Sequence, residues 1–160
     1  MRKKPIFISY SSEDKDFVSV LVGLLRGLLS NLIRPNPVFQ DIDSIRPGQN
    51  WYLAIQEAIE GSERLFVFWC IHSKASKVVA REYNLALKLE KLVIPILLDS
   101  TPLPAKLRTI QWVDLRSINP HGVDTIRRRH DGGLDMSSLD EHARYLYNCF
   151  APTGLWETYW

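Results

Sequence analysis

One carboxylate in the chain occupies a helical position where an ionised side chain is unexpected. A helix turns about 100° per residue, so Lys77, Arg81 and Lys88 fall on one polar stripe of the helix they share. Glu82 falls within the opposite, apolar arc, about 140° from Lys77. Ionised carboxylates avoid such places unless a partner pairs with them or a pocket opens there. Glu82 is therefore either a structural glutamate or a carboxylate that does chemistry.

Strand and helix signals alternate along the chain and indicate how Glu82 is positioned. Helices are expected from residue 15 to about 33, over 51–60, around Glu82 and over 137–150, with a loop at 119–135. Strands are expected at 5–10, 38–40, 64–71, 92–98 and 110–115. Pro95 within the fourth strand is typical of an edge or a bulge. Five strands separated by helices predict an α/β fold with a five-stranded, doubly wound parallel sheet.

The sheet predicts where a ligand would bind. Sheets of this kind bind ligands beyond the carboxyl ends of their strands, at the switch point of the strand order. Tyr10, Asp41 and His72 each end an expected strand. We therefore expect the loop at residues 41–50 and the start of the Glu82 helix to meet at one crevice.

Composition excludes several classes of protein. The 160 residues suffice for one domain with a real core, and the net charge of +2 is too small to indicate nucleic acid or an anionic membrane as partner. Polar residues interrupt the apolar stretch at 17–33, which favours a core helix over a membrane span. Cys70 and Cys149 make no disulfide framework, so we expect a cytoplasmic location.

Motifs for common cofactors are missing. No GxGxxG follows a strand and no P-loop exists. A phospho-receiver is also disfavoured: Glu13 and Asp14 follow the first strand, but the third ends in Cys70-Ile71-His72, without an acceptor aspartate. The four histidines are scattered and lack metal-ligand spacing, so no metal is expected. The basic run at 127–130 is short, and a solvated loop explains it better than a nucleic-acid contact.

Three motifs in order resemble the TIR (Toll/interleukin-1 receptor) domain family. The segment IFISYS at 6–11 resembles its first box, and DIDSIRPG at 41–48 its second, the BB loop. The segment FWC at 68–70, with the serines and Glu82 that follow, resembles the turn and helix that hold the family's catalytic glutamate. The match runs over about 5–115 and implies the flavodoxin-like TIR fold. The combination looks bacterial and resembles the stand-alone TIR proteins of Thoeris-type anti-phage defence.

The resemblance implies an activity. Many TIR domains cleave NAD at the bond between nicotinamide and ribose, giving nicotinamide and ADP-ribose or cyclic isomers that act as signal nucleotides. NAD would then be a substrate, with no further cofactor. A carboxylate can stabilise the oxocarbenium-like ribose, hold its hydroxyls or take a proton. Glu82 matches the catalytic position, and the residues implied to bind substrate are Tyr10, Ser11, Ile45, Arg46, Gly48, Ser73 and Ser76.

One departure keeps two functional classes open. Active relatives often carry tryptophan four residues before the catalytic glutamate, and this chain has Val78 there. Stacking on the substrate would then need another aromatic ring, with Trp51 or Tyr83 the candidates. The carboxylate at Glu82 favours an NAD-consuming immune enzyme that signals to a separate nucleotide-responsive effector. Val78 favours a catalytically silent scaffold that acts by TIR–TIR self-association.

The expected domain ends before the last ten residues. Residues 1–150 form a single expected domain, and residues 151–160 form a tail that contains Trp156, Tyr159 and Trp160. Such an aromatic terminus is expected to pack on the domain or on a neighbouring molecule.

Overall fold

The computed structural model of the chain describes residues 6–32, 39–40, 47–117 and 148–150. Residues 148–150 are helical, as expected for the end of a last helix. The rest of that helix, the loop expected at 119–135, the first part of the loop at 41–50 and the tail at 151–160 lie outside the described residues. The division into a domain at 1–150 and a tail therefore remains a prediction.

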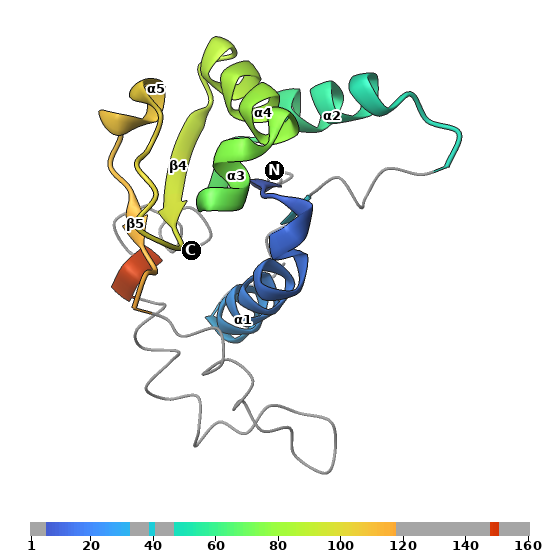
Figure 1. The fold of residues 1–160 in the computed structure, drawn as a ribbon. Helices are drawn as coiled ribbons and strands as arrows, with labels where there is room; N and C mark the ends of the chain where they lie inside the picture. The colour runs from blue at the N-terminus through green and yellow to red at the C-terminus, as the bar shows by residue number, and fades with distance from the viewer. Residues whose placement is uncertain (1–5, 33–38, 41–46, 118–147, 151–160) are drawn as a thin grey trace.

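A five-stranded parallel sheet organises the molecule (Figure 1). In spatial order its strands are β2 (Phe39–Gln40), β1 (Ile6–Ser9), β3 (Arg64–Trp69), β4 (Leu92–Leu97) and β5 (Val113–Asp114). Every neighbouring pair is parallel. This is the predicted sheet, in the strand order of flavodoxin-like folds, and the order reverses between β1 and β3.

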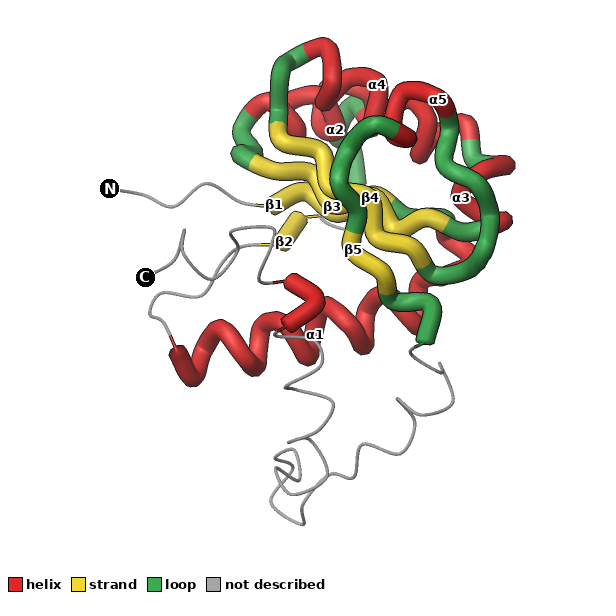
Figure 2. Tube along the Cα trace, turned by 90° about the vertical axis from the view of Figure 1, so that its left-hand side faces the viewer, coloured by secondary structure: helices red, strands yellow, loops and turns green. Residues whose placement is uncertain are grey.

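Helices cover both faces of the sheet. They are the short 3₁₀ helix η1 (Ser12–Asp14) and the α-helices α1 (Lys15–Leu32), α2 (Trp51–Glu60), α3 (Ile71–Ala75), α4 (Lys77–Lys88) and α5 (Ala105–Arg108). Helix α1 runs along one face, and α2, α4 and α5 lie on the other (Figure 2). The fold is therefore doubly wound, as predicted.

Alternation along the strands divides the core into two clusters. Successive strand side chains point to opposite faces of a sheet. Even-numbered residues of β1, β3 and β4 pack with α1: Ile6, Ile8, Phe66, Phe68, Ile94 and Ile96. Odd-numbered ones pack with α2 and α4: Phe7, Leu65, Val67, Trp69, Val93 and Leu97. All six residues of β3 are buried, which explains why its sequence is almost continuously apolar.

Pro95 lies inside the sheet, which corrects the expectation of an edge or a bulge. The N–H of Leu98 donates to β3, whereas the C=O of Leu97 accepts from the chain after β5. The backbone N–H and C=O groups of successive strand residues point to alternate sides. Pro95 therefore faces the same side as Leu97, and its nitrogen points toward β5. That strand begins only at Val113, which is level with Ile96. The missing N–H therefore removes no ladder hydrogen bond, and proline is tolerated.

Two further elements differ from expectation. The fifth strand begins at Val113 rather than at residue 110. The expected polar turn after the third strand is the one-turn helix α3, and His72 lies inside it instead of ending a strand. Asp99, which follows β4, caps this helix by accepting the N–H of Ile71 at 2.9 Å. No helix in the part of the chain that the structure describes is long and apolar enough to cross a bilayer.

Candidate functional site

Glu82 is a buried carboxylate at the carboxyl edge of the sheet. Its side chain projects from α4 toward β1, and only 4% of the residue is exposed. The hydroxyl of Ser9, the last residue of β1, donates to Glu82 Oε1 at 2.9 Å. Helix α4 places Val79, Tyr83 and Ala86 in the core beside it, as the helical arc predicts. The fold thus buries an acid on the apolar side of a helix and gives it a hydroxyl donor.

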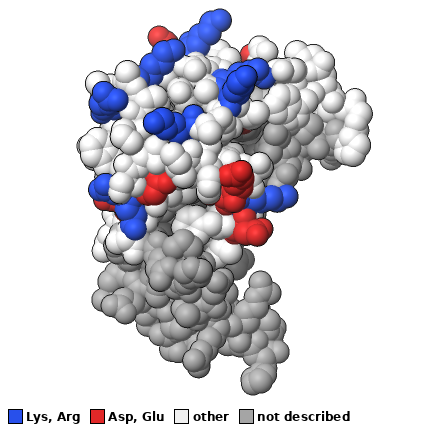
Figure 3. Space-filling model, in the orientation of Figure 1, with Lys and Arg blue, Asp and Glu red and all other residues white. Residues whose placement is uncertain are grey.

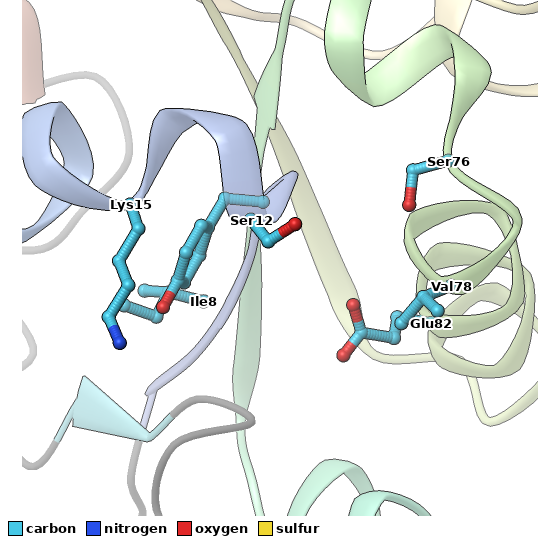
Figure 4. A pocket seen from close by; sticks show the side chains of 7 residues that line it. Ile8, Ser12, Lys15, Ser76, Val78 and Glu82 are labelled. Carbon is cyan, nitrogen blue, oxygen red and sulfur yellow. The ribbon is translucent and has the colours of Figure 1, made fainter.

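A pocket of about 240 Å³ opens next to this carboxylate. Figure 4 shows Ser76, Val78 and Glu82 on the α4 side, facing Ser12 and Lys15 across the pocket. Ile8 and Tyr10 complete the lining that the structure describes. Most of these residues follow the carboxyl end of β1 or the start of α4, so the pocket lies near the switch point between β1 and β3. Of the two segments expected to meet at a crevice here, the start of the Glu82 helix lines the pocket. Residues 41–46 of the loop lie outside the described residues, and residues 47–50 are not among the described lining residues.

Ser76 holds the start of the helix that carries Glu82. Its side chain caps α4 by accepting the N–H of Val79 at 3.2 Å. A hydroxyl that accepts a hydrogen bond still carries a proton to donate, so Ser76 retains a donor at the pocket wall. One serine therefore fixes the helix and contributes to the pocket.

The structure brings some of the candidate site residues together and places others elsewhere. Tyr10 and Ser76 line the pocket with Glu82. Ser11 is buried and caps η1, with its hydroxyl accepting the N–H of Glu13 at 3.4 Å. Ser73 is also buried, and its hydroxyl donates to the carbonyl of Phe68. Neither Ser11 nor Ser73 is among the described lining residues, and both positions have a local structural explanation.

The remaining candidates come from the second motif. Ile45 and Arg46 lie outside the described residues. Gly48 is exposed and has a φ of +89°, a backbone conformation that favours glycine. Trp51, at the start of α2, is half-buried and packs against the core cluster of that face, with its ring 5.0 Å from that of Tyr52. Their assignment as substrate-binding residues remains a prediction.

Sequence reasoning did not anticipate the contributions of Ser9, Ser12 and Lys15. Ser9 is a buried polar residue that ends an otherwise apolar strand, and that pattern was the available signal. Ser12 begins η1 and Lys15 begins α1, the two elements that follow β1 directly, so both residues reach the same edge as Tyr10. Their side chains place a hydroxyl and an ammonium group across the pocket from the carboxylate (Figure 4).

A second polar cluster lies at the same edge of the sheet. Asp14, at the end of η1, accepts a hydrogen bond from the thiol of Cys70 at 2.7 Å and forms a second one with His72 Nδ1 at 2.9 Å. The other ring nitrogen of His72 lies 3.2 Å from Glu13 Oε2. The hydrogen bond with Asp14 raises the pKa of His72 above its usual value. Burial and the neighbouring Asp14 raise the pKa of the Cys70 thiol.

Comparisons with known proteins agree on the fold. A family model described as "TIR domain" matches residues 6–128. The TIR domain of the Toll-related receptor TRR-2 from Hydra magnipapillata is similar with a TM-score of 0.59 and 20% identity, over 89% of this chain and 99% of that one. The TIR domains of the activated Roq1 resistosome, which recognises the pathogen effector XopQ, are similar with a TM-score of 0.55 and 14% identity, over 90% of this chain and 99% of that one. No curated protein matches the chain.

Proposed function

Because the chain belongs to the TIR domain family, we propose that it cleaves the bond between nicotinamide and ribose in NAD, with Glu82 as the catalytic carboxylate. The observation that carries the proposal is the pocket beside Glu82. A buried acid on an apolar helical arc is costly unless it is paired or used. Here the acid has a pairing partner in Ser9 and also borders a space that a ligand could enter.

The arrangement suits a reaction that develops positive charge on a ribose. As nicotinamide leaves, the ribose gains oxocarbenium character, and a carboxylate beside it stabilises that charge. The same carboxylate could accept a hydrogen bond from a ribose hydroxyl, or take the proton of the attacking group. Ser9 would hold Glu82 in one orientation, because its hydroxyl fixes Oε1. The Glu82 carboxylate would thus act from a position set by β1.

The size of the pocket suggests which part of NAD enters it. Pockets that enclose drug-sized ligands measure roughly 300–1,000 Å³. This one measures about 240 Å³, so it would admit the nicotinamide riboside end rather than the whole dinucleotide. Lys15 and the hydroxyl of Ser12, at the opposite wall, would meet the phosphates or the ribose.

A silent scaffold is the alternative, and two observations favour it. Val78 lines the pocket where active relatives often carry tryptophan, so that wall lacks an aromatic ring for stacking. The Ser9 hydrogen bond is also what a purely structural glutamate would make. In that case the domain would act by self-association alone, and Glu82 would hold α4 against β1.

If the chain is an enzyme, its product would be a signal nucleotide of the ADP-ribose type. The protein would release this nucleotide in the cytoplasm as part of bacterial immunity. A separate, nucleotide-responsive effector would then receive it. A transfer experiment separates this from direct contact: the protein is incubated with NAD and removed by filtration, and the filtrate is applied to a candidate effector. Activation by the filtrate would support a diffusible product, whereas activation that requires the protein itself would support the scaffold.

The proposal is tested by incubating the purified full chain with NAD and resolving the nucleotides by chromatography and mass spectrometry. Release of nicotinamide together with ADP-ribose or a cyclic isomer is expected. A crowding agent is included in a parallel reaction to promote association. If NAD stays intact in both reactions, over protein concentrations that include the associated state, the enzymatic reading is wrong.

Activity is expected to depend on assembly, because the loop at 41–50 is predicted to border the crevice, where a loop can act both as a gate and as a contact surface. Over a dilution series of about a hundredfold, the rate per molecule should fall as the assembly dissociates by mass action. Gly48→Pro should lower both association and rate, since proline fixes φ near −65° and the native φ is +89°. The measurements are initial rates and light-scattering mass on the same samples.

The control for Gly48→Pro is a substitution at a glycine whose backbone conformation suits other residues. Gly23 is exposed on α1, and a methyl group there would meet no atom within 4 Å. Gly23→Ala should leave association and rate unchanged. A constant rate per molecule with a monomeric mass throughout the series would refute the dependence on assembly.

A further inference from the structure

We propose that Asp14, Cys70 and His72 form a binding site for a thiophilic divalent cation, with Zn²⁺ as the ion that fits best. The carboxylate of Asp14, the sulfur of Cys70 and a ring nitrogen of His72 lie within 4.8 Å of one another. They come from the ends of two adjacent strands: Asp14 follows β1, and Cys70 and His72 follow β3. Neighbouring ligands of a tetrahedral zinc ion, bound at about 2.0–2.3 Å, are about 3.5 Å apart.

The donor set selects the class of ion. A thiolate and an imidazole disfavour Mg²⁺ and Ca²⁺, which require oxygen ligands, and are typical of zinc sites together with one carboxylate. Asp14 lies 2.7 Å from Cys70 Sγ and 2.9 Å from His72 Nδ1, so these two separations would open by less than about 1 Å around an ion. Three protein ligands leave a fourth position for water.

The surroundings of the three ligands match those of a metal site. A metal-ligating histidine usually donates its second ring N–H to a carboxylate, which fixes its orientation. Here Nδ1 faces Asp14, while Nε2 lies 3.2 Å from Glu13 Oε2. The Ser73 hydroxyl lies 3.5 Å from Cys70 Sγ and helps to orient the sulfur. Glu13 and Ser73 would therefore support the ligands from outside.

Charge at this edge also favours a cation. Glu13 and Asp14 lie 3.2 Å and 2.9 Å from the two ring nitrogens of His72, and Asp99 accepts the N–H of the preceding residue, Ile71, so three carboxylates gather at the start of α3. Figure 3 shows acidic side chains gathered near the middle of the face, with basic side chains above them and also beside them. A bound divalent ion would offset this negative charge and the thiolate that metal binding requires.

The ion would tie together the two walls of the Glu82 pocket. Asp14 ends η1, and its neighbours Ser12 and Lys15 line one wall. Cys70 and His72 lie at the start of α3, and Ser76 follows this helix directly and lines the opposite wall. A metal bridge between η1 and α3 would therefore hold the width of the pocket. The site would have this structural role whether or not the pocket cleaves NAD.

The test measures the metal directly on the full chain, kept reduced and freed of metal with a chelator. Titration with Zn²⁺ in a calorimeter should show one strong site. In a separate thermal melt, Zn²⁺ should raise the melting temperature. Co²⁺ should give visible bands of a tetrahedral ion and a near-ultraviolet thiolate-to-cobalt band, and Zn²⁺ should abolish both. Neither readout depends on NAD cleavage, so the metal site and the enzymatic proposal can fail separately.

Variants identify the ligands. Cys70→Ser should remove the thiolate-to-cobalt band, and Asp14→Asn and His72→Gln should each weaken Zn²⁺ binding by at least about tenfold. His72 is exposed, so His72→Gln keeps the test available even if Cys70→Ser impairs folding. The matched control is Cys149→Ser, since Cys149 is half-buried and lies outside the cluster. Binding that is absent, that persists unchanged in the ligand variants, or that Cys149→Ser abolishes would overturn the proposal.

Discussion

Glu82→Gln is expected to lower the rate of NAD cleavage by at least about 100-fold while the fold stays intact. The substitution keeps the size of the side chain and removes the negative charge that would stabilise the ribose cation. The amide oxygen of glutamine can still accept the hydroxyl of Ser9, which now donates to Glu82 Oε1 at 2.9 Å. The free energy of unfolding should therefore change by no more than about 1 kcal/mol. The measurements are nicotinamide release and thermal melting.

Glu57→Gln is the matched control, because Glu57 is an exposed glutamate of helix α2 and its substitution removes the same charge. It should leave both the rate and the stability unchanged. If Glu82→Gln cleaves NAD as fast as the unaltered chain, the catalytic assignment is wrong. If it melts several degrees lower, as Glu57→Gln does not, the structural role of Glu82 gains support and the scaffold becomes the better hypothesis.

The position of Glu82 could be predicted because helical periodicity is a local property of the sequence. The arc that contains Val79, Tyr83 and Ala86 is buried in the structure, and Glu82 lies within it. The sheet followed from the same kind of reasoning, since buried parallel strands are continuous apolar runs and helices separate them. The predicted topology then placed the carboxyl ends of β1 and β3 side by side.

The partners of Glu82 were less predictable, because they depend on contacts between distant segments. Ser9 donates to Glu82 across 73 positions of the chain, and nothing local marks that pairing. Spacing rules for metal ligands could not point to the proposed cation site for the same reason: 56 residues separate Asp14 from Cys70, and the fold alone brings them together. The polar turn expected around His72 proved to be α3, because Asp99, which follows β4, caps its first residue.

Pro95 shows how a local rule can give the wrong result in a tertiary context. Proline removes one donor, and the rule assumes that a neighbouring strand needs it. The strand on that side is short and begins beyond the proline, so the donor would have had no partner. The length of β5 decided the outcome, and a sequence pattern does not fix the length of a neighbouring strand.

Phe66→Ala is expected to lower the free energy of unfolding by about 3–5 kcal/mol, because it leaves a large cavity in the core between the sheet and α1. Phe66 is fully buried on β3, the strand that leads to Cys70. Its ring lies 5.7 Å from that of Phe150, which is also fully buried although 84 positions separate the two residues. The melting temperature should fall by roughly 2–4 °C per kcal/mol in a chain of this size.

A double-mutant cycle extends the test to the C-terminal segment. Phe150→Ala should be destabilising for the same reason as Phe66→Ala, and the two effects should be less than additive by about 0.5–1.5 kcal/mol because the rings pack on each other. Leu53→Ala is the control: Leu53 is 55% exposed on α2, so its loss should cost less than about 0.5 kcal/mol. Denaturant unfolding of the four chains and the control gives each free energy. If Phe150→Ala costs no more than Leu53→Ala, the segment at 148–150 does not pack against β3, and the core on the α1 face ends before it.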